Sequence, residues 1–184
     1  MSCLPMTPTG SYITKASGTF SAVSTSALVQ YYPIKDSVIT LSNIAQGTNQ
    51  PVEILSVRVR ETATAGNQKL KGLILYFYTD AAPTTPTLAA VYDAPTSNLV
   101  ATCIVGSADY TLRVRSGADE VWDAIVMPSR DADVCTPFFV TGTTSTANNL
   151  YCVALANEAV TYVGTTDITV EVIARVHYGS TTLA

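Results

Sequence analysis

The stretch LKGLILYFYTDAAPTTPT, residues 70–87, decides the fold class expected of this chain. Its aliphatic and aromatic residues run from Leu73 to Tyr78 without a helical period, and the run then ends in a segment of Thr, Ala and Pro. A short run that is apolar on both faces is typical of a buried strand. Side chains alternate along a strand, which places Leu73, Leu75 and Phe77 on one face and Ile74, Tyr76 and Tyr78 on the other. We expect a central sandwich strand, with the first face in the core and the second covered by a neighbouring subunit or a folded-back loop.

Other segments alternate apolar and polar residues with a period of two, which indicates strands that bury one face. In EILSVRVRE, residues 53–61, one face carries Leu55, Val57 and Val59, and the other carries Ser56, Arg58 and Arg60. In DITVEVIARVHY, residues 167–178, the apolar face carries Ile168, Val170, Val172, Ala174 and Val176, opposite Glu171, Arg175 and His177.

Turn-rich gaps separate these segments at the intervals expected of a sandwich or barrel, and no alternation of strands with helices is visible. The sequence therefore predicts an all-β antiparallel fold, a two-sheet sandwich or a barrel, in a single domain over residues 15–184. The expected strands lie near residues 18–23, 27–32, 37–44, 52–61, 70–79, 87–92, 99–105, 110–115, 136–140, 150–157 and 167–178.

Two segments depart from this pattern. Residues 1–14, with Pro5 and Pro8, are expected to form an extended N-terminal arm. GADEVWDAIV, residues 117–126, is the one helix candidate, because Val121, Trp122 and Ile125 fall on one helical stripe. The same residues also fit a short strand. We favour an irregular or one-to-two-turn helical segment there.

The composition excludes several classes of function. The net charge is −4, with ten Lys and Arg against fourteen acidic residues, and the basic residues form no cluster of the kind that nucleic acid requires. No nucleic-acid partner is expected. The N-terminus lacks the features of a signal peptide, and the longest apolar run is far shorter than the roughly 20 residues that span a bilayer, so no membrane partner is expected either.

The residues that carry chemistry are few. His177 is the only histidine and belongs to no nucleophile motif, so no catalytic residue is expected. Metal-ligand spacings are absent, and the acidic groups Asp119, Glu120, Asp123 and Asp131, Asp133 are interpreted as solvated loops rather than a calcium site. We expect no cofactor.

The remaining candidates for chemistry are cysteines and aromatic residues. Cys3, Cys103, Cys135 and Cys152 are interpreted as free thiols, although a bridge between Cys135 and Cys152 stays open. The ten tyrosines are expected mainly in the core or at a subunit interface, with a sugar-binding face as the alternative.

Three segments, taken in order, carry a family resemblance. They are SGTF at residues 17–20, LSVRVRETATAGNQKLKGLILYFYTD at 55–80 and NNLYCVALANEAVTYVGTTDITVEVIAR at 149–175. The second holds an R-x-R strand, a Gly-containing turn and an apolar strand followed by a Pro-rich loop. The third holds a strand, an Ala-rich connection and a long strand entered through a G-x-x-D turn. In this arrangement residues 17–178 resemble the capsid decoration or cement proteins of tailed bacteriophages, although the stretch 116–135 has no counterpart.

The resemblance implies a jelly-roll sandwich that works on the outside of the virion, commonly as a trimer, and has no catalytic residues. The implied partners are the major capsid protein and the chain itself, as a homotrimer made in the host cytoplasm. The residues expected at contacts between subunits are Leu4, Pro5, Met6 and Pro8 of the arm and Ile74, Tyr76 and Tyr78 of the apolar strand. The alternatives are a carbohydrate- or receptor-binding module, such as a head fibre or lectin, and another structural protein of the phage tail or neck.

Overall fold

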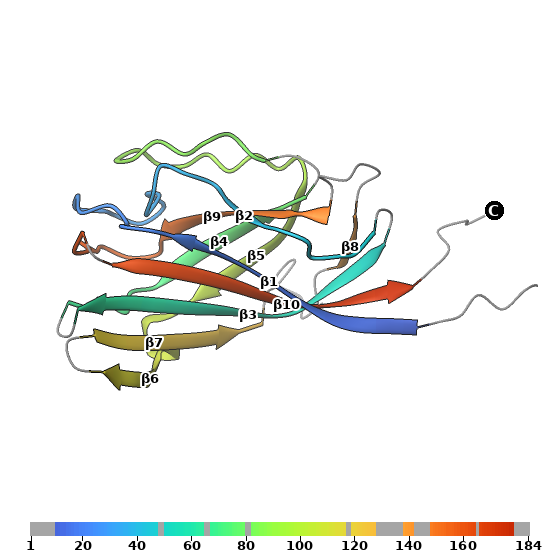
Figure 1. Ribbon diagram of the computed structural model, residues 1–184. Helices are drawn as coiled ribbons and strands as arrows, with labels where there is room; N and C mark the ends of the chain where they lie inside the picture. The colour runs from blue at the N-terminus through green and yellow to red at the C-terminus, as the bar shows by residue number, and fades with distance from the viewer. Residues whose placement is uncertain are drawn as a thin grey trace, which may run out of the picture.

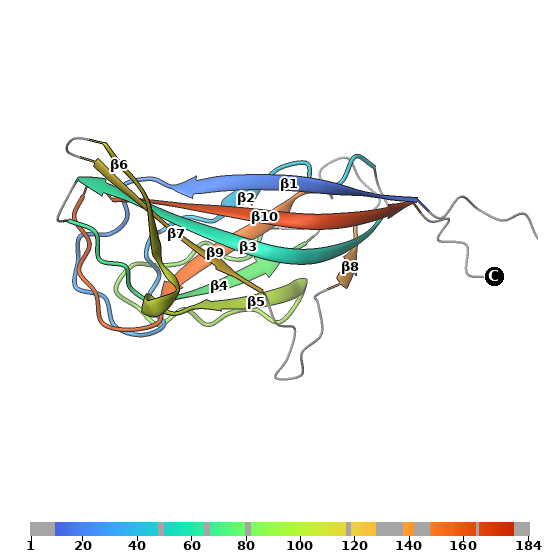
Figure 2. The same ribbon diagram turned by 90° about the horizontal axis from the view of Figure 1, so that it is seen from below.

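The computed structural model describes residues 10–47, 50–64, 67–79, 82–116, 119–127, 138–141, 148–164 and 166–178. They form two antiparallel sheets packed face to face (Figure 1, Figure 2). The sheet that we call the β3 sheet runs in the order β1 (Gly10–Phe20), β10 (Asp167–Tyr178), β3 (Pro51–Thr64), β7 (Asp119–Val126) and β6 (Thr111–Ser116), and β8 (Phe138–Val140) also pairs with β3. The second, the β4 sheet, runs in the order β2 (Ile39–Leu41), β9 (Leu150–Ala156), β4 (Leu73–Tyr78) and β5 (Leu99–Val105). A short 3-10 helix, η1 (Ser107–Asp109), joins β5 to β6.

The strands pair as they do in a jelly roll. Apart from the edge strand β6 and the short β8, β1 pairs with β10, β2 with β9, β3 with β7 and β4 with β5. Rolling up one long hairpin gives this nested order, because it inserts β10 between β1 and β3 and β9 between β2 and β4. The predicted antiparallel jelly-roll sandwich is confirmed.

The core lies between the two sheets and is built from the alternating apolar faces. All five apolar residues predicted for one face of β10 are buried, and so are Leu73, Leu75 and Phe77 on β4. Their side chains interdigitate with those of β1, β3 and β9 in one continuous cluster. The period-two pattern therefore identified the inner faces of these two strands correctly.

Leu55 on β3 is an exception to the predicted alternation. The register between β3 and β10 shifts so that Ile54 lies opposite Ala174 and Ser56 opposite Ile173, which leaves Leu55 without a partner. Such a bulge adds one residue and inverts the faces on either side of it. Ile54 is therefore buried and Leu55 only half-buried, so the prediction that Leu55 shares the core face with Val57 and Val59 is wrong.

The helical segment favoured over residues 117–126 is also wrong, because Asp119–Val126 form strand β7. This strand pairs with β3 on one side and with β6 on the other. Two ladders of backbone hydrogen bonds outweigh the weak helical stripe. Within β7, Ala124 points into the core and Asp123 points away from it, as the strand alternative requires.

The predicted boundaries of the first strand also need correction. The expected arm reached residue 14, but β1 begins at Gly10, and its residues 10–14 pair with residues 174–178 of β10. Residues 1–9 lie outside the described part of the chain. Two other predicted strands are mostly irregular: 27–32 contains one isolated bridge, between Leu28 and Val160, and 87–92 lies in a loop with a turn at 88–90.

Candidate interaction surfaces

The outer face of the β4 sheet is covered in part by its own chain, and Ile104 on β5, opposite Ile74, stays 61% exposed. Ile74 and Tyr78 are 4% and 0% exposed, in a second small cluster with Val153 and Leu155. Tyr92, from the loop that connects β4 to β5, packs against this cluster. Of the two coverings that the sequence left open, the structure has the folded-back loop.

This burial bears on the expected contact residues. Because Ile74 and Tyr78 are enclosed within one chain, they present no side-chain surface to a neighbouring subunit, and their assignment as contact residues is corrected here. Tyr76 is half-buried and keeps that prediction. Leu4, Pro5, Met6 and Pro8 lie outside the described residues.

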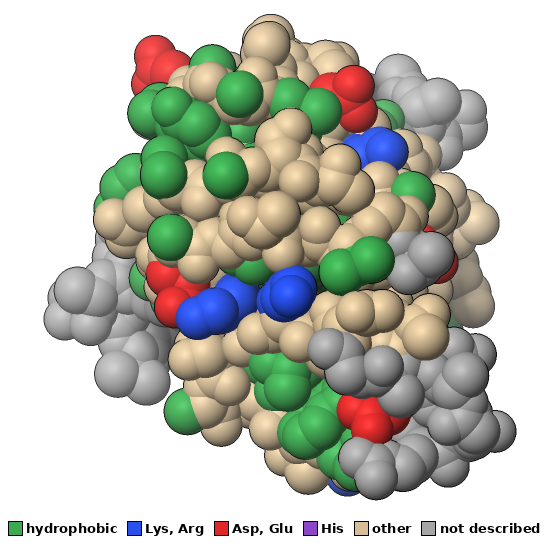
Figure 3. All heavy atoms as spheres, turned by 90° about the vertical axis from the view of Figure 1, so that its left-hand side faces the viewer, with side chains coloured by type: hydrophobic (Ala, Val, Ile, Leu, Met, Phe, Trp, Pro, Cys, Tyr) green, Lys and Arg blue, Asp and Glu red, His purple; other side chains and the backbone are tan. Residues whose placement is uncertain are grey.

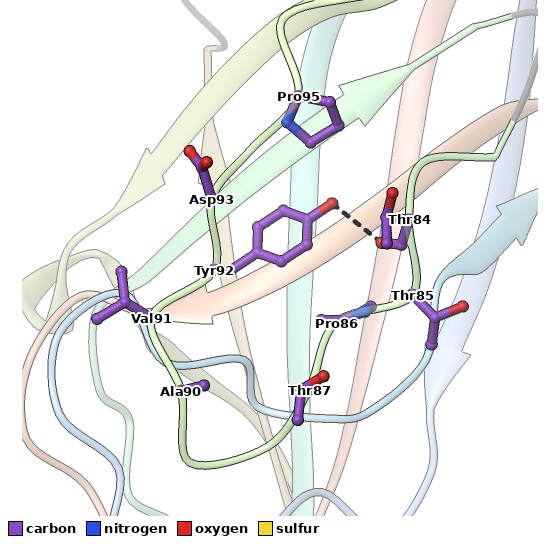
Figure 4. A pocket seen from close by; sticks show the side chains of 9 residues that line it. All are labelled: Thr84, Thr85, Pro86, Thr87, Ala90, Val91, Tyr92, Asp93 and Pro95. Carbon is purple, nitrogen blue, oxygen red and sulfur yellow. Dashed lines mark hydrogen bonds between the residues drawn. The ribbon is translucent and has the colours of Figure 1, made fainter.

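The covering loop, residues 79–98, is held at its base and along its length. The amide of Thr79 donates to the carbonyl of Asn98 at 3.0 Å, and the amide of Tyr92 donates to the carbonyl of Tyr31 at 3.1 Å. Figure 4 shows two arms of the loop running side by side, with the Tyr92 ring reaching across and its hydroxyl donating to the Thr84 carbonyl at 3.2 Å. The arms border a shallow hollow of about 270 Å³, lined by Thr84, Thr85, Pro86, Thr87, Ala90, Val91, Tyr92, Asp93 and Pro95.

The outer face of the β3 sheet differs from that of the β4 sheet. Charged side chains cross it from strand to strand in a continuous series of ion pairs, beginning with Lys15 Nζ and Glu171 Oε2 at 3.2 Å. Glu171 lies 3.8 Å from Arg58 Nη1, and Arg58 in turn binds Asp123. The series ends on β6, where Arg113 Nε lies 3.6 Å from Asp123 Oδ2. It thus joins β1, β10, β3, β7 and β6.

Asp123 is the centre of this series. Its side chain is 0% exposed, and Arg58 donates to it through Nε at 2.9 Å and through Nη2. Arg60 donates to the other carboxylate oxygen through Nε at 3.0 Å. The bond to Asp123 raises the pKa of Arg58 above its ordinary value. A buried carboxylate requires such partners, because an unpaired one would lose its hydration without compensation.

Exposed aliphatic side chains lie beside these charges. Ile13 on β1 is 59% exposed and Ile125 on β7 is 56% exposed. In the strand register Ile125 is opposite Arg58 and Ile13 is opposite Arg175, so the apolar and charged residues share one face. Arg175 itself lies 3.0 Å from Glu53. The face therefore combines arginine with exposed aliphatic area.

Glu61, on the core face of β3, is a buried glutamate. Figure 3 shows the end of the sandwich that lies on the left of Figure 1, where charged side chains are scattered among hydrophobic and uncharged ones. Both Glu61 oxygens accept backbone hydrogens, from Lys69 at 2.7 Å and from Leu70 at 2.9 Å. These bonds hold Leu70 in a left-handed conformation, with φ of 48°. Burial raises the pKa of Glu61, and the two backbone bonds oppose the rise.

Of the residues that the sequence singled out for chemistry, His177, Glu120 and Asp123 are each paired with neighbouring side chains. His177 Nε2 lies 3.7 Å from Glu53 Oε2 on the neighbouring strand. Glu120 and Asp123 point to opposite faces of β7, since the Trp122 indole donates to Glu120 whereas Asp123 faces the arginines. Asp131 and Asp133 lie outside the described residues. In the part of the chain that the structure describes, no group of three or more His, Cys, Asp and Glu is arranged to hold a metal ion.

Cys103 and Cys152 are buried free thiols, as predicted, and the bridge from Cys152 to Cys135 that stayed open is therefore absent. Burial raises the pKa of Cys103 to about 12. Cys3 and Cys135 lie outside the described residues. Among those residues, no helix is long and apolar enough to cross a membrane.

Comparisons with known proteins give virus structures. No family model matches the chain. No curated protein matches it either. A chain in the structure of Desmodium yellow mottle tymovirus aligns with 99% of this chain and over 98% of its own length, with 12% sequence identity and a TM-score of 0.35. Mud crab tombus-like virus aligns over 98% and 87%, with 12% identity and a TM-score of 0.29. A marine algae virus of the order Picornavirales aligns over 91% and 69%, with 14% identity and a TM-score of 0.28.

Proposed function

We propose that this chain is a virion structural protein, a capsid decoration protein that binds the outside of a bacteriophage head and stabilises it through protein–protein contacts. The observation that carries the proposal is the difference between the two outer faces of the sandwich. On the β4 face the chain's own loop covers Ile74 and Tyr78 and leaves Ile104 exposed. The β3 face, in contrast, combines exposed Ile13 and Ile125 with a series of arginines. Arginine with exposed apolar area is the composition favoured at protein interfaces.

The fold supports the same proposal. Nested pairing places the three longest strands, β1, β10 and β3, side by side, so the β3 sheet presents a broad surface on a scaffold with a continuous core. The resemblance of residues 17–178 to decoration proteins is consistent with that use. We propose the major capsid protein as the partner and a homotrimer as the working form, because symmetric closure is the usual way for identical chains to cover one another's surfaces.

The test uses phage heads that lack a decoration protein. Purified chain is added to these heads, bound protein is separated by sedimentation, and the thermal stability of the heads is measured with and without it. The proposal expects saturable binding and a raised melting temperature of the heads, because a ligand that binds only the assembled shell stabilises it. Sedimentation without bound protein, and an unchanged melting temperature, would overturn it.

A second candidate function is carbohydrate binding, and the hollow in the covering loop is the observation that favours it. The residues that line this hollow of about 270 Å³ include Thr84, Thr85, Thr87, Asp93 and the ring of Tyr92. Hydroxyls, a carboxylate and an aromatic ring are groups that bind sugars. A glycan array checks this function. Binding that is lost in Asp93→Asn and kept in Asp109→Asn would support carbohydrate binding. An array on which the protein binds no glycan would exclude it in favour of the decoration role.

A further inference from the structure

The outer face of the β3 sheet has a charge opposite to that of the whole chain. Among the side chains that the structure describes, it carries five of the ten basic residues of the sequence, against four acidic ones. The basic ones are Lys15, Arg58, Arg60, Arg113 and Arg175, and the acidic ones are Glu53, Asp123, Asp167 and Glu171. Because the chain as a whole has a net charge of −4, this one face is a positive surface on an acidic protein.

Asp123 makes the face more positive toward solvent than the count of charges indicates. Its carboxylate is fully shielded, whereas the side chains of Arg60 and Arg113 are 41% and 48% exposed. A partner therefore meets guanidinium groups and not the carboxylate that lies beneath them. Asp123 gathers arginines from β3 and β6 that strand geometry alone would hold apart.

The two exposed arginines keep hydrogen-bond donors for a partner. A guanidinium has five N–H donors, and Arg60 and Arg113 both approach Asp123 through Nε. The Nη groups lie at the outer end of each side chain. Pairs of such N–H groups match the two oxygens of a carboxylate, which they bind in a bidentate manner.

The chemistry of the surroundings favours a protein over a nucleic acid as the partner. Ile13 and Ile125 expose aliphatic area on the same face, and Glu171 and Glu53 lie among the basic residues. A phosphate backbone would be repelled by these two glutamates and would gain little from the isoleucines. Protein interfaces combine apolar contact with a few complementary charges, whereas nucleic-acid interfaces are much more uniformly positive.

We propose that the outer face of the β3 sheet binds a carboxylate-rich protein surface, to which Arg60 and Arg113 donate hydrogen bonds while Asp123 holds them in position. The partner that it fits is a surface of Asp and Glu side chains with an apolar strip beside them. Under the proposed function, on which this inference rests, that surface belongs to the capsid shell.

The test removes the two exposed arginines and compares the result with a charge-matched control. The arginine variant is Arg60→Gln with Arg113→Gln. The control is Lys35→Gln with Lys69→Gln, which lowers the net charge by the same amount in loops outside the strands of this face. Binding to undecorated heads is measured at about 50 and 300 mM salt. The arginine variant is expected to bind at least about tenfold more weakly at low salt, whereas the control binds like the wild type. The variant Arg60→Lys with Arg113→Lys keeps the charge but loses the planar guanidinium that binds a carboxylate in a bidentate manner. Its affinity is expected to lie between those of the arginine variant and the control.

A second probe separates failure of this inference from failure of the proposed function. Poly-L-glutamate and a DNA duplex of equal charge are titrated against the wild type and the arginine variant, with thermal unfolding as a check on folding. Salt-sensitive binding of polyglutamate that the arginine variant loses supports the inference, even if the wild type binds no heads and the proposed function fails. Equal binding by the two proteins, no binding of polyglutamate, or stronger arginine-dependent binding of DNA overturns it.

Discussion

Arg58 on β3 donates two hydrogen bonds to Asp123 on the neighbouring strand β7, and the carboxylate that receives them is entirely shielded from solvent. The two residues are far apart in the sequence, and strand pairing brings them together. Asp123 also binds Arg60 on β3 and lies 3.6 Å from Arg113 on β6. It therefore links the stability of the β3 sheet to the surface that the sheet presents.

Replacing Asp123 by Asn is expected to destabilise the fold by about 2 kcal/mol, because it leaves the charges of Arg58 and Arg60 without their shared carboxylate. This loss in the free energy of unfolding is smaller than the loss expected on breaking a fully buried ion pair, since both arginines are partly exposed. Urea unfolding measures it. The control, Glu171→Gln, removes a more exposed carboxylate from the same series and is expected to cost under about 1 kcal/mol. Equal costs for the two variants would contradict a central role for Asp123.

The pH dependence of the free energy of unfolding should reveal the contribution of the buried Glu61 carboxyl. Its folded-state pKa lies above the ordinary value of 4.5, so the folded chain holds this proton more tightly than the unfolded chain does. Its contribution is therefore fully present below the unfolded pKa and declines as the pH rises through the folded pKa. The stability of the wild type relative to Glu61→Gln should thus be greater near about pH 4.5 than near about pH 7, as urea unfolding at each pH can measure.

Glu158 provides a control of opposite sign for that experiment. Hydrogen bonds from the Gly72 amide and from Lys71 lower its folded-state pKa. Its contribution is present above the unfolded pKa and is lost as the pH falls through the folded pKa. The stability of the wild type relative to Glu158→Gln should fall on acidification. If both variants change in the same direction, the environment assigned to Glu61 is incorrect.

Two truncations test the N-terminal arm separately from strand β1. Removing residues 2–9 is expected to leave thermal unfolding unchanged and to weaken attachment to heads, because this segment holds the expected contact residues Leu4, Pro5, Met6 and Pro8. Removing residues 2–14 also deletes the part of β1 that pairs with residues 174–178 of β10, so it should destabilise the domain. Circular dichroism melting and head sedimentation measure the two effects. Unaltered attachment after the shorter deletion would remove the arm from the docking mechanism.

The buried thiols should be inert in the folded protein. In a Cys3→Ser, Cys135→Ser background, Cys103 and Cys152 are expected to resist a thiol reagent until the chain unfolds, because burial raises the pKa of both thiols and keeps the reagent out. Absorbance of the released reagent should follow the unfolding transition in urea. Rapid reaction under native conditions would mean that the sheets separate locally.

Local patterns predicted the strands whose burial is one-sided and regular. The alternation in β10 and the apolar run in β4 give the inner face of each strand directly, and residues 99–105 were predicted with the bounds that β5 has. The bulge at Leu55 was not predictable in this way, because it depends on the register with β10. Residues 119–126 fit both a helix and a strand, and only the distant partners β3 and β6 decide between them.

The candidate site was predicted only in part, for a similar reason. The alternation of EILSVRVRE places Arg58 and Arg60 on the polar face of their strand, whereas Asp123 stands in the sequence only as one of a group of acidic residues. Nothing local indicates that three arginines from β3 and β6 converge on that one carboxylate. For the face of Ile74 and Tyr78, the sequence leaves two coverings open, a neighbouring subunit or a folded-back loop. The loop is the covering found, because Tyr92 packs against the cluster that contains Ile74 and Tyr78.

The nested pairing has a consequence for how the protein is made. β10 is the last described strand to leave the ribosome, yet it occupies an inner position in its sheet, between β1 and β3. Until residues 167–178 are synthesised, β1 and β3 have no partner on their facing edges, so the sheet cannot close before then. Contacts between segments far apart in the sequence also form slowly. The newborn chain therefore exposes unpaired strand edges until β10 is made, and its yield should depend on chaperones and on the temperature of expression.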